Sequence, residues 1–235
     1  MKGSKNSMEV NIPIYPDTKD IEQMNHASVK EYYNSVNSKI YRSLDYFKTR
    51  ENEISKLLQD SIGKSILDIG AGDGFWVEHF IDKINVYIAV EQSNNNCQSI
   101  ETKLCSCEKE IHILNVNAFQ FEYSNIDVDT LLFCFFISHF DISSIIKLIQ
   151  KINQNVNFNK IIILDSFWSE HRKIKYIDNN LQLQKRIINK NGDTVEIPKR
   201  YITIEDLHEL SSAMKMKQEI KYIDEYWCFA LLTSW

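Results

Sequence analysis

Three glycines lie close together in a chain that contains few of them. Gly70, Gly72 and Gly74 are three of the six glycines among 235 residues. The apolar stretch 65–69 before them predicts a buried strand, and 75–80 after them begins a predicted helix. Because glycine adopts positive φ and exposes bare backbone to a ligand, this strand–turn–helix predicts a turn that holds a ligand at its tip.

Two acids accompany the glycine turn and bear on the choice of ligand. Asp68 stands two residues before Gly70, and Glu91 ends the next predicted strand. A dinucleotide-binding turn has the spacing Gly-x-Gly-x-x-Gly and binds a pyrophosphate, whereas the third glycine here comes one residue early. Carboxylates repel a phosphate and favour a cationic or zwitterionic ligand. Because a carboxylate at the position of Glu91 can also accept ribose hydroxyls, the pattern favours an adenosyl sulfonium over a dinucleotide.

Strand and helix patterns alternate through the middle of the chain and must position these residues. The near-continuous apolar strands indicate a parallel sheet covered on both faces. The last two predicted strands follow each other across a short turn, which indicates an antiparallel pair. We expect parallel strands at 65–69, 86–90, 111–114, 130–136 and 160–164, helices at 74–83, 95–109 and 143–153, and the closing pair at 219–223 and 227–233.

The segments on either side of this core differ from it in pattern. Residues 1–60 predict a polar N-terminal arm followed by cap helices, and 61–235 predict one ligand-binding domain. Within that domain, 166–205 interrupts the alternation and predicts an insertion that covers the substrate. We expect a charged helical piece at 170–183, a hairpin at 186–197 centred on Asn191-Gly192, and a helix that starts with a capping-box pattern at Thr203–Asp206 and ends at Met214.

Composition excludes several classes of protein. The net charge of −5 without a strongly basic block argues against nucleic acid as the partner. No apolar run approaches the ~18 residues of a membrane span, and the polar N-terminus is unlike a signal peptide. Five irregularly spaced cysteines fit free thiols in a reducing compartment better than a metal site. We expect a cytoplasmic protein with no metal, no membrane contact and a small-molecule substrate, and a homodimer stays open as its assembly.

The motif Asp68-Ile-Gly70-Ala-Gly72-Asp-Gly74, taken with Glu91, resembles the class I S-adenosylmethionine-dependent methyltransferases. The resemblance covers about 60–235 and includes the closing strand pair. It implies an α/β fold, namely a doubly wound, mostly parallel seven-stranded sheet with a final antiparallel strand pair. It also implies a cap made by N-terminal helices and an insertion before strand six. The implied cofactor is S-adenosyl-L-methionine.

The same resemblance implies roles for individual residues. The glycine turn would face the methionine part of the cofactor, Glu91 would take the ribose, and Asn117 would meet the adenine amino group. The cofactor-binding residues implied in this way are Asp68, Gly70, Ala71, Gly72, Gly74, Trp76, Glu91, Gln92, Asn117, Ala118, Phe119 and Phe135.

Open parallel sheets bind ligands beyond the carboxyl ends of their strands. We therefore take the residues that directly follow two central strands as the candidate catalytic residues. Ile137-Ser138-His139-Phe140 resembles the Leu-Ser-His-Val element of a small-molecule branch of the family. Histidine is the usual base near neutral pH, so we expect His139 to act as general base or to orient the acceptor. A histidine bonded to the backbone at a strand end is the alternative. Asp165 is the second candidate, although such a carboxylate can simply cap a turn.

Candidate substrate contacts come from the arm and the insertion. They are Tyr32, Tyr33, Tyr41, Trp168 and Arg200, although tyrosines at helical spacing fit packing equally well. Basic residues also gather in the insertion, where they fit either a solvated face or a site for an anionic acceptor. This basic cluster comprises Arg172, Lys173, Lys175, Lys185, Arg186, Lys199 and Arg200.

Taken together, the patterns predict an enzyme that transfers a methyl group to an oxygen or nitrogen of a small molecule by in-line displacement. Two alternatives stay open, a nucleic-acid or protein methyltransferase and an inactive cofactor-binding scaffold subunit. Base-modifying members of the family often carry Asn/Asp-Pro-Pro-Tyr after strand four, whereas this chain has Phe136-Ile-Ser-His139 there. A glycine turn that only reverses the chain is the purely structural alternative.

Overall fold

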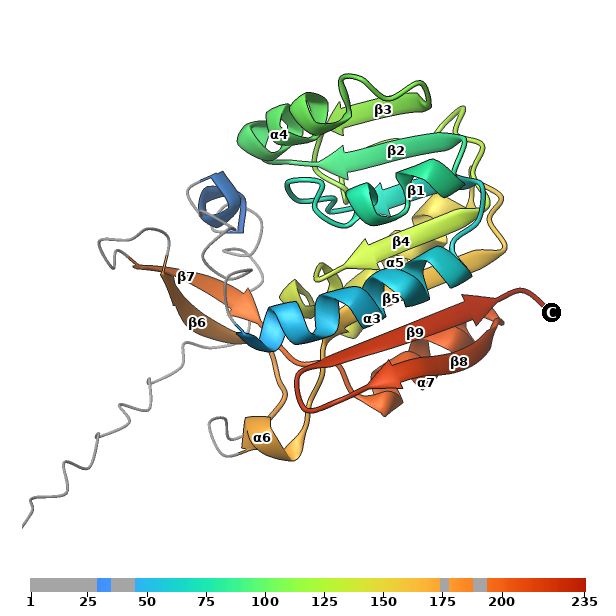
Figure 1. Ribbon diagram of the computed structural model, residues 1–235. Coiled ribbons are helices and arrows are strands. Elements are labelled where there is room, and N and C mark those ends of the chain that lie inside the picture. Colours follow the sequence, from blue (N-terminus) through green and yellow to red (C-terminus); the bar gives the residue numbers. More distant parts are fainter. Residues whose placement is uncertain (1–28, 35–44, 174–177, 188–193) are drawn as a thin grey trace, which may run out of the picture.

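The computed structural model describes residues 29–34, 45–173, 178–187 and 194–235, and its centre is a seven-stranded sheet (Figure 1). The strand order is β3-β2-β1-β4-β5-β9-β8. The first five of these strands are parallel, whereas β9 runs antiparallel to β5 and to β8. This arrangement confirms the predicted doubly wound sheet with a closing antiparallel pair. The strands are β1 (Ser65–Ile69), β2 (Val86–Glu91), β3 (Glu110–Asn115), β4 (Thr130–Cys134), β5 (Lys160–Ser166), β8 (Lys217–Ile223) and β9 (Trp227–Thr233).

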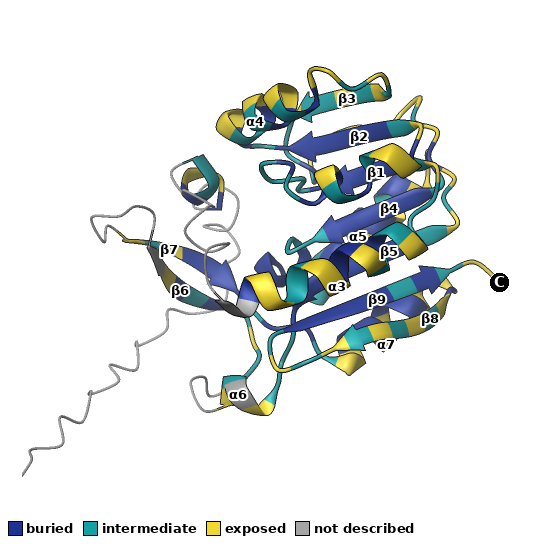
Figure 2. Ribbon diagram, in the orientation of Figure 1, coloured by how far each residue is buried: buried dark blue, intermediate teal, exposed yellow. Residues whose placement is uncertain are grey.

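Helices cover both faces of the sheet, as its buried strands require. The helices α5 (Ile142–Asn153) and α7 (Ile204–Met214) pack on one face, and α3 (Asp45–Ser61) and α4 (Asn94–Leu104) pack on the other. Successive strand residues alternate between the two cores, since side chains in a strand have a period of two. In β5, for example, Ile161 and Ile163 face α5 while Ile162 faces α3, and all three are fully buried. Figure 2 shows the buried central strands.

The predicted helix at 74–83 is wrong. The structure has two short 3₁₀ turns instead, η1 (Val77–His79) and η2 (Ile81–Lys83). Between them Phe80 leaves the helical region, with φ −136° and ψ 1°, and buries its ring in the core. Because the backbone is not helical at Phe80, the i to i−4 hydrogen bonds of an α-helix cannot run through the segment.

Other element boundaries also differ from expectation. The helix α4 ends at Leu104 rather than at 109, and β4 ends at Cys134 because Phe135 has a φ of +56°. The charged piece at 170–183 is helical only in α6 (Glu170–Lys173) among its described residues, and 182 already belongs to a strand. The extended conformation of β5 continues to Ser166 because its last residues still pair with β9.

The insertion contains the expected hairpin. Its strands β6 (Gln182–Ile187) and β7 (Thr194–Lys199) pair antiparallel as a separate two-stranded sheet. The predicted Asn191-Gly192 turn lies outside the described residues. The capping box of α7 is present, since Thr203 accepts from the Asp206 N–H and Asp206 accepts from the Thr203 N–H.

The hairpin and the short helix at 29–34 lie beyond the carboxyl ends of the parallel strands (Figure 1). They therefore occupy the edge of the sheet at which α/β proteins bind ligands. Among the helices that the structure describes, none is long and apolar enough to cross a membrane.

Candidate functional site

A cavity of about 320 Å³ lies at the carboxyl ends of β1, β2 and β4. Its wall combines the glycine turn after β1, the end of β2, the loop after β3 and the residues after β4. The helix at 29–34 and the hairpin strand β7 complete the wall. The parallel sheet thus brings together segments that are far apart in sequence.

The glycine turn contributes bare backbone to this cavity. Gly72 has a φ of +59°, and a Cβ built on it would meet nothing within 4 Å. Gly70 also has positive φ, but a Cβ there would lie 2.2 Å from the Phe136 ring. Glycine is therefore needed for a different purpose at each position: at Gly72 it leaves space for a ligand, and at Gly70 it makes room for the Phe136 side chain. Gly74, predicted to bind the cofactor, instead lies against Ile100 of α4 and is absent from the cavity wall.

Asp68, near the end of β1, brings a buried carboxylate to the cavity. Its side chain accepts a 2.7 Å hydrogen bond from the Tyr87 hydroxyl through Oδ2, while Oδ1 is buried and has no partner among the described residues. Burial raises the pKa of Asp68 to about 7, against the effect of the Tyr87 hydrogen bond and with a smaller contribution from Glu91. A buried acceptor without a donor is costly, so this oxygen is suited to a cationic donor from a ligand.

Glu91, at the end of β2, braces the glycine turn. Its Oε2 accepts from the Gly72 N–H at 2.9 Å and its Oε1 accepts from the Ser93 N–H at 2.7 Å. Burial raises the pKa of Glu91 to about 7 although these backbone donors lower it. Each carboxylate oxygen has further acceptor capacity, so Glu91 can also accept hydroxyl groups from a ligand in the cavity.

The loop after β3 supplies an amide side chain. Asn117 accepts from the Phe119 N–H at 2.9 Å, which fixes the loop, and its Nδ2 lies 3.3 Å from Gln92 Oε1. All three residues line the cavity. Two aromatic rings close another part of the wall, Trp76 and Phe135, whose ring centroids are 6.3 Å apart and stacked.

Eleven of the twelve residues predicted to bind the cofactor therefore line one cavity. They are Asp68, Gly70, Ala71, Gly72, Trp76, Glu91, Gln92, Asn117, Ala118, Phe119 and Phe135.

His139 lies in the 3₁₀ turn η3 (Ile137–His139) after β4 and lines the cavity. Its Nδ1 is 2.8 Å from the Pro198 carbonyl oxygen. Because a carbonyl only accepts, Nδ1 carries the proton, and in the neutral ring Nε2 accepts from the Tyr33 hydroxyl 3.0 Å away. The imidazole is thus oriented by the hairpin through Pro198 and presents its basic nitrogen to the cap helix at 29–34.

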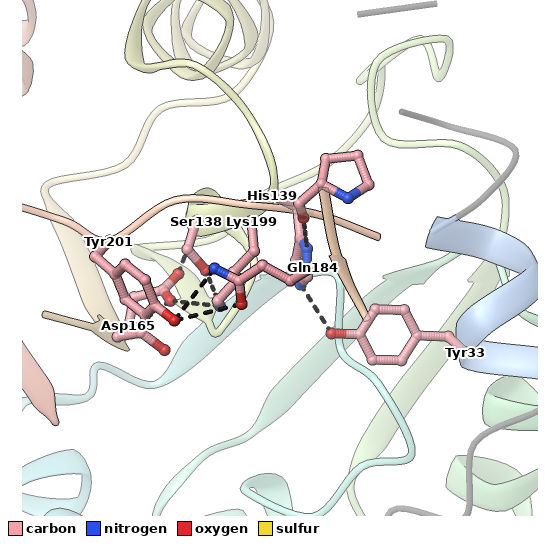
Figure 3. A network of polar contacts seen from close by, with 9 residues as sticks. Tyr33, Ser138, His139, Asp165, Gln184, Lys199 and Tyr201 are labelled. Atoms are coloured by element: carbon pink, nitrogen blue, oxygen red, sulfur yellow. Dashed lines mark hydrogen bonds and ion pairs between the residues drawn. The ribbon is translucent and has the colours of Figure 1, made fainter. Parts of the chain in front are cut away.

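Asp165, the second catalytic candidate, is fully buried behind the cavity wall. It accepts from the N–H groups of Ser138 at 3.0 Å and Ser166 at 2.7 Å. Lys199 Nζ lies 3.6 Å from Asp165 Oδ1 and donates to Ser138 Oγ, as Figure 3 shows. Asp165 therefore orders the strand end and its lysine, and the prediction that it acts on substrate does not fit this placement. The lysine, which does line the cavity, was predicted only as part of the basic cluster.

The five predicted substrate contacts divide into three groups. Tyr32 and Tyr33 line the cavity, whereas Tyr41 lies outside the described residues. Trp168 and Arg200 are not part of the cavity wall. Trp168 stacks on the ring of Tyr201 and Arg200 pairs with Asp206 at 2.6 Å, so both support the wall from behind.

Sequence reasoning missed several wall residues because they lack a motif. These are mainly aromatic or aliphatic side chains such as Phe140, Ile197 and Tyr201, which read as ordinary core positions. Arg172 was visible only as one of the basic cluster, and it too lines the cavity.

Several solved structures have the same fold as this chain. A DhpI–SAM–HEP complex superposes with a TM-score of 0.72 at 14% identity, covering 92% of this chain and 99% of that one. A methyltransferase from Clostridium acetobutylicum ATCC 824 gives a TM-score of 0.57 at 14% identity, covering 89% and 98%. Magnesium protoporphyrin IX methyltransferase (ChlM) from Synechocystis PCC 6803 with bound SAM gives 0.58 at 11% identity, covering 88% and 95%. No protein-family model and no curated protein matches the chain.

The fold is therefore the Rossmann-like fold of the class I S-adenosylmethionine-dependent methyltransferases. The likeness extends over nearly the whole of this chain and of these structures.

Proposed function

We propose that this protein is an S-adenosylmethionine-dependent methyltransferase that methylates an oxygen or nitrogen of a small molecule. One observation carries the proposal: Asp68, whose Oδ1 has no hydrogen-bond partner among the described residues, lines the same cavity as the open backbone of Gly72 and the carboxylate of Glu91. A cationic group for Asp68, hydroxyls for Glu91 and close contact for Gly72 are together what an adenosyl sulfonium offers. A dinucleotide would instead bring phosphates next to two carboxylates.

The residues present fit this cofactor. Asp68 would hold its ammonium group, Glu91 its ribose hydroxyls and Asn117 the edge of its adenine, with Trp76 and Phe135 keeping water from the wall. When bound, S-adenosylmethionine supplies a methyl group activated by the adjacent positive sulfur. The protein then has to hold the acceptor in line with it, and alignment of this kind contributes several kcal/mol.

His139 is suited to manage the acceptor proton. Its Nδ1–H is committed to the Pro198 carbonyl, which leaves Nε2 as the basic atom on the cavity side. An acceptor hydroxyl that takes the place of the Tyr33 hydroxyl would donate its proton to Nε2 as its oxygen forms the new bond to carbon. An acceptor ammonium would give its proton to Nε2 first, because only the neutral amine has the lone pair that forms the bond. The proton leaves the acceptor for the ring, and the acceptor leaves methylated.

The shape of the cavity supports a small acceptor. The cap helix at 29–34 and strand β7 both contribute to its wall, so a ligand there is covered by protein. The names of the neighbours point the same way, since ChlM is named for magnesium protoporphyrin IX and another similar structure, CalS10, is described as an amino pentose methyltransferase. Methylation of nucleic acid or protein, and a purely cofactor-binding role, are the outcomes against which the proposal is tested.

Calorimetry and methyl transfer test the proposal together. We expect S-adenosylmethionine and its demethylated product, S-adenosylhomocysteine, to bind to the purified chain and NAD not to bind. Transfer of tritium from labelled cofactor is expected into a small-metabolite fraction rather than into RNA or protein. Binding without transfer to any fraction would support the scaffold role, and the absence of binding would overturn the proposal altogether.

A further inference from the structure

The charged residues of the cavity wall come from two different parts of the fold. The acids Asp68 and Glu91 belong to β1 and β2, and the acid Asp73 belongs to the glycine turn. The cations Arg172 and Lys199 belong to α6 and β7, in the insertion that covers the site. A cationic cofactor accounts for the acids. The positive groups of the cofactor do not account for the cations, which would repel a positively charged acceptor.

Lys199 has a partner of opposite charge within the protein. Its ammonium lies 3.6 Å from the fully buried carboxylate of Asp165 and also donates to Ser138 Oγ. The buried pair is close to neutral, so Lys199 mainly orders the wall beside His139.

Arg172 is held in place without a carboxylate. Its guanidinium carbon lies 4.5 Å from the centroid of the Tyr201 ring and 5.4 Å from that of Tyr226. Within the described part of the chain no acid lies within ion-pair distance of Arg172, and its Nε is buried without a hydrogen-bond acceptor. The two rings fix the plane of the guanidinium but leave its hydrogen bonds unmade. A buried cationic donor without an acceptor is costly, and an anionic ligand would satisfy it.

Apolar side chains also line the same cavity. Phe136, Phe140 and Ile197 line the cavity together with Tyr201. Such a surface suits the body of a hydrophobic or aromatic molecule, with Arg172 at the position of its charged group.

We infer that the methyl acceptor carries an oxyanion, either a carboxylate or a phosphate, and that Arg172 binds it through the planar fork of its guanidinium. The inference rests on the proposed function and adds the chemical class of the substrate. Arg172 would fix one end of the acceptor and so determine which of its atoms faces His139 and the cofactor's methyl group. The rival ligand for Arg172 is the carboxylate of the cofactor itself.

The test compares three small ligands on protein saturated with S-adenosylhomocysteine. Benzoate and phenyl phosphate carry the two kinds of oxyanion on the same apolar ring, and benzamide is the neutral control. By calorimetry we expect at least one of the anions to bind about tenfold or more tightly than benzamide. Binding of benzoate alone identifies a carboxylate acceptor, and binding of phenyl phosphate alone identifies a phosphate; both results support the inference.

Variants assign the effect to Arg172. Arg172→Gln is expected to lose the preference for the anion, and Arg172→Lys to keep only part of it, because lysine retains the charge but not the fork. Lys173→Gln is the matched control, since it removes one positive charge from the same helix at an exposed side chain whose ion-pair partner among the described residues is Glu170. It should bind the anions as the natural protein does. Affinity for S-adenosylhomocysteine should stay within about threefold in all variants, which also reports that they are folded.

Three results would overturn the inference. Equal binding of anions and benzamide, in a protein that binds S-adenosylhomocysteine, would remove the oxyanion site and leave the proposed function intact. A tenfold loss of S-adenosylhomocysteine affinity in Arg172→Gln would assign Arg172 to the cofactor's carboxylate. A matching loss of anion binding in Lys173→Gln would show that only net charge acts. Failure of the natural protein to bind S-adenosylhomocysteine would be a failure of the proposed function and is seen before any anion is added.

Discussion

Asp68 and Glu91 carry the negative charge of the cofactor half of the site. Burial raises the pKa of each carboxyl to about 7, whereas their ordinary values are near 4. In the ligand-free folded state these groups therefore keep protons that the unfolded chain has already released. Their contribution makes folding less favourable as pH rises from about 4 to about 7. A cationic ligand binds the ionised carboxylates, so it offsets this loss of folding stability.

The first prediction concerns the pH dependence of cofactor affinity. Affinity for S-adenosylmethionine should rise about tenfold between pH 6 and pH 7.5, because the carboxyls must ionise to hold the ligand. Asp68→Asn should bind at least about tenfold more weakly at pH 7.5 and show a flatter profile. The exposed Asp82, replaced by Asn, is the control. Calorimetry at several pH values checks this, and an unchanged affinity in Asp68→Asn would contradict the role of that carboxylate.

The second prediction concerns His139. His139→Ala should bind S-adenosylmethionine normally and lower turnover at least about tenfold, because the proton acceptor is lost. Tyr33→Phe keeps the imidazole and removes only the hydroxyl bonded to Nε2, so its turnover should fall much less. His112→Ala changes an exposed histidine and serves as control. If turnover and its pH profile survive in His139→Ala, the residue anchors the hairpin through Pro198 and has no part in proton transfer.

At the scale of elements, the segment that follows β1 differs from the predicted turn and helix. The turn forms as predicted, but the helix after it is replaced by two 3₁₀ turns that place Trp76 in the cavity wall and Phe80 in the core. Periodicity alone could not separate these outcomes, because a spacing of three to four residues fits an α-helix and successive 3₁₀ turns about equally over ten residues.

The third prediction compares two glycines of this turn. Gly70→Ala should lower the free energy of unfolding by well over the ~1–2 kcal/mol that a positive φ costs a residue other than glycine. The added Cβ would also lie 2.2 Å from the Phe136 ring. The Cβ added by Gly72→Ala would meet nothing within 4 Å, so the free energy of unfolding should fall only by the cost of the positive φ. The same methyl group would enter the space for the ligand and should abolish cofactor binding. Urea unfolding and calorimetry on both variants check this. If the two variants were equally stable, the prediction that only Gly70 is packed against a side chain would be contradicted.

The whole molecule brings the cap and the sheet together around the site. Tyr33 in the cap helix bonds His139 after β4, and the neighbouring Asn34 contacts Ser93 after β2. A ligand in the cavity is therefore bound by the sheet and the cap together, so binding should stabilise the molecule as one unit.

The fourth prediction follows from this coupling. At a free concentration of about one hundred times its Kd, S-adenosylhomocysteine should raise the free energy of unfolding by about 2.7 kcal/mol. NAD at the same concentration should leave it unchanged. Denaturant unfolding, followed by a probe of the sheet and a probe of the cap, checks both parts. A ligand that stabilised the sheet but left the cap to unfold separately would show that Tyr33 and Asn34 contribute nothing to binding.

By itself, the sequence determined where the strands of the main sheet lie along the chain, the position of the glycine turn and the two acids near strand ends. Apolar runs, turn residues and the spacing of glycines are local properties, so they can be read without knowing what packs where. The same local character made Gly74 look like a binding residue, although its neighbour is Ile100.

Only the tertiary structure decided which polar side chains share the cavity. Asp165 and Lys199 are far apart in the chain, and their pairing turns a candidate catalyst into a buried support. Arg172 was one of seven residues in the basic cluster of the insertion. It is distinguished only by two tyrosine rings from separate segments and by having no described acid within ion-pair distance. Such partners are set by packing between distant elements, and a periodic pattern along one chain carries no record of them.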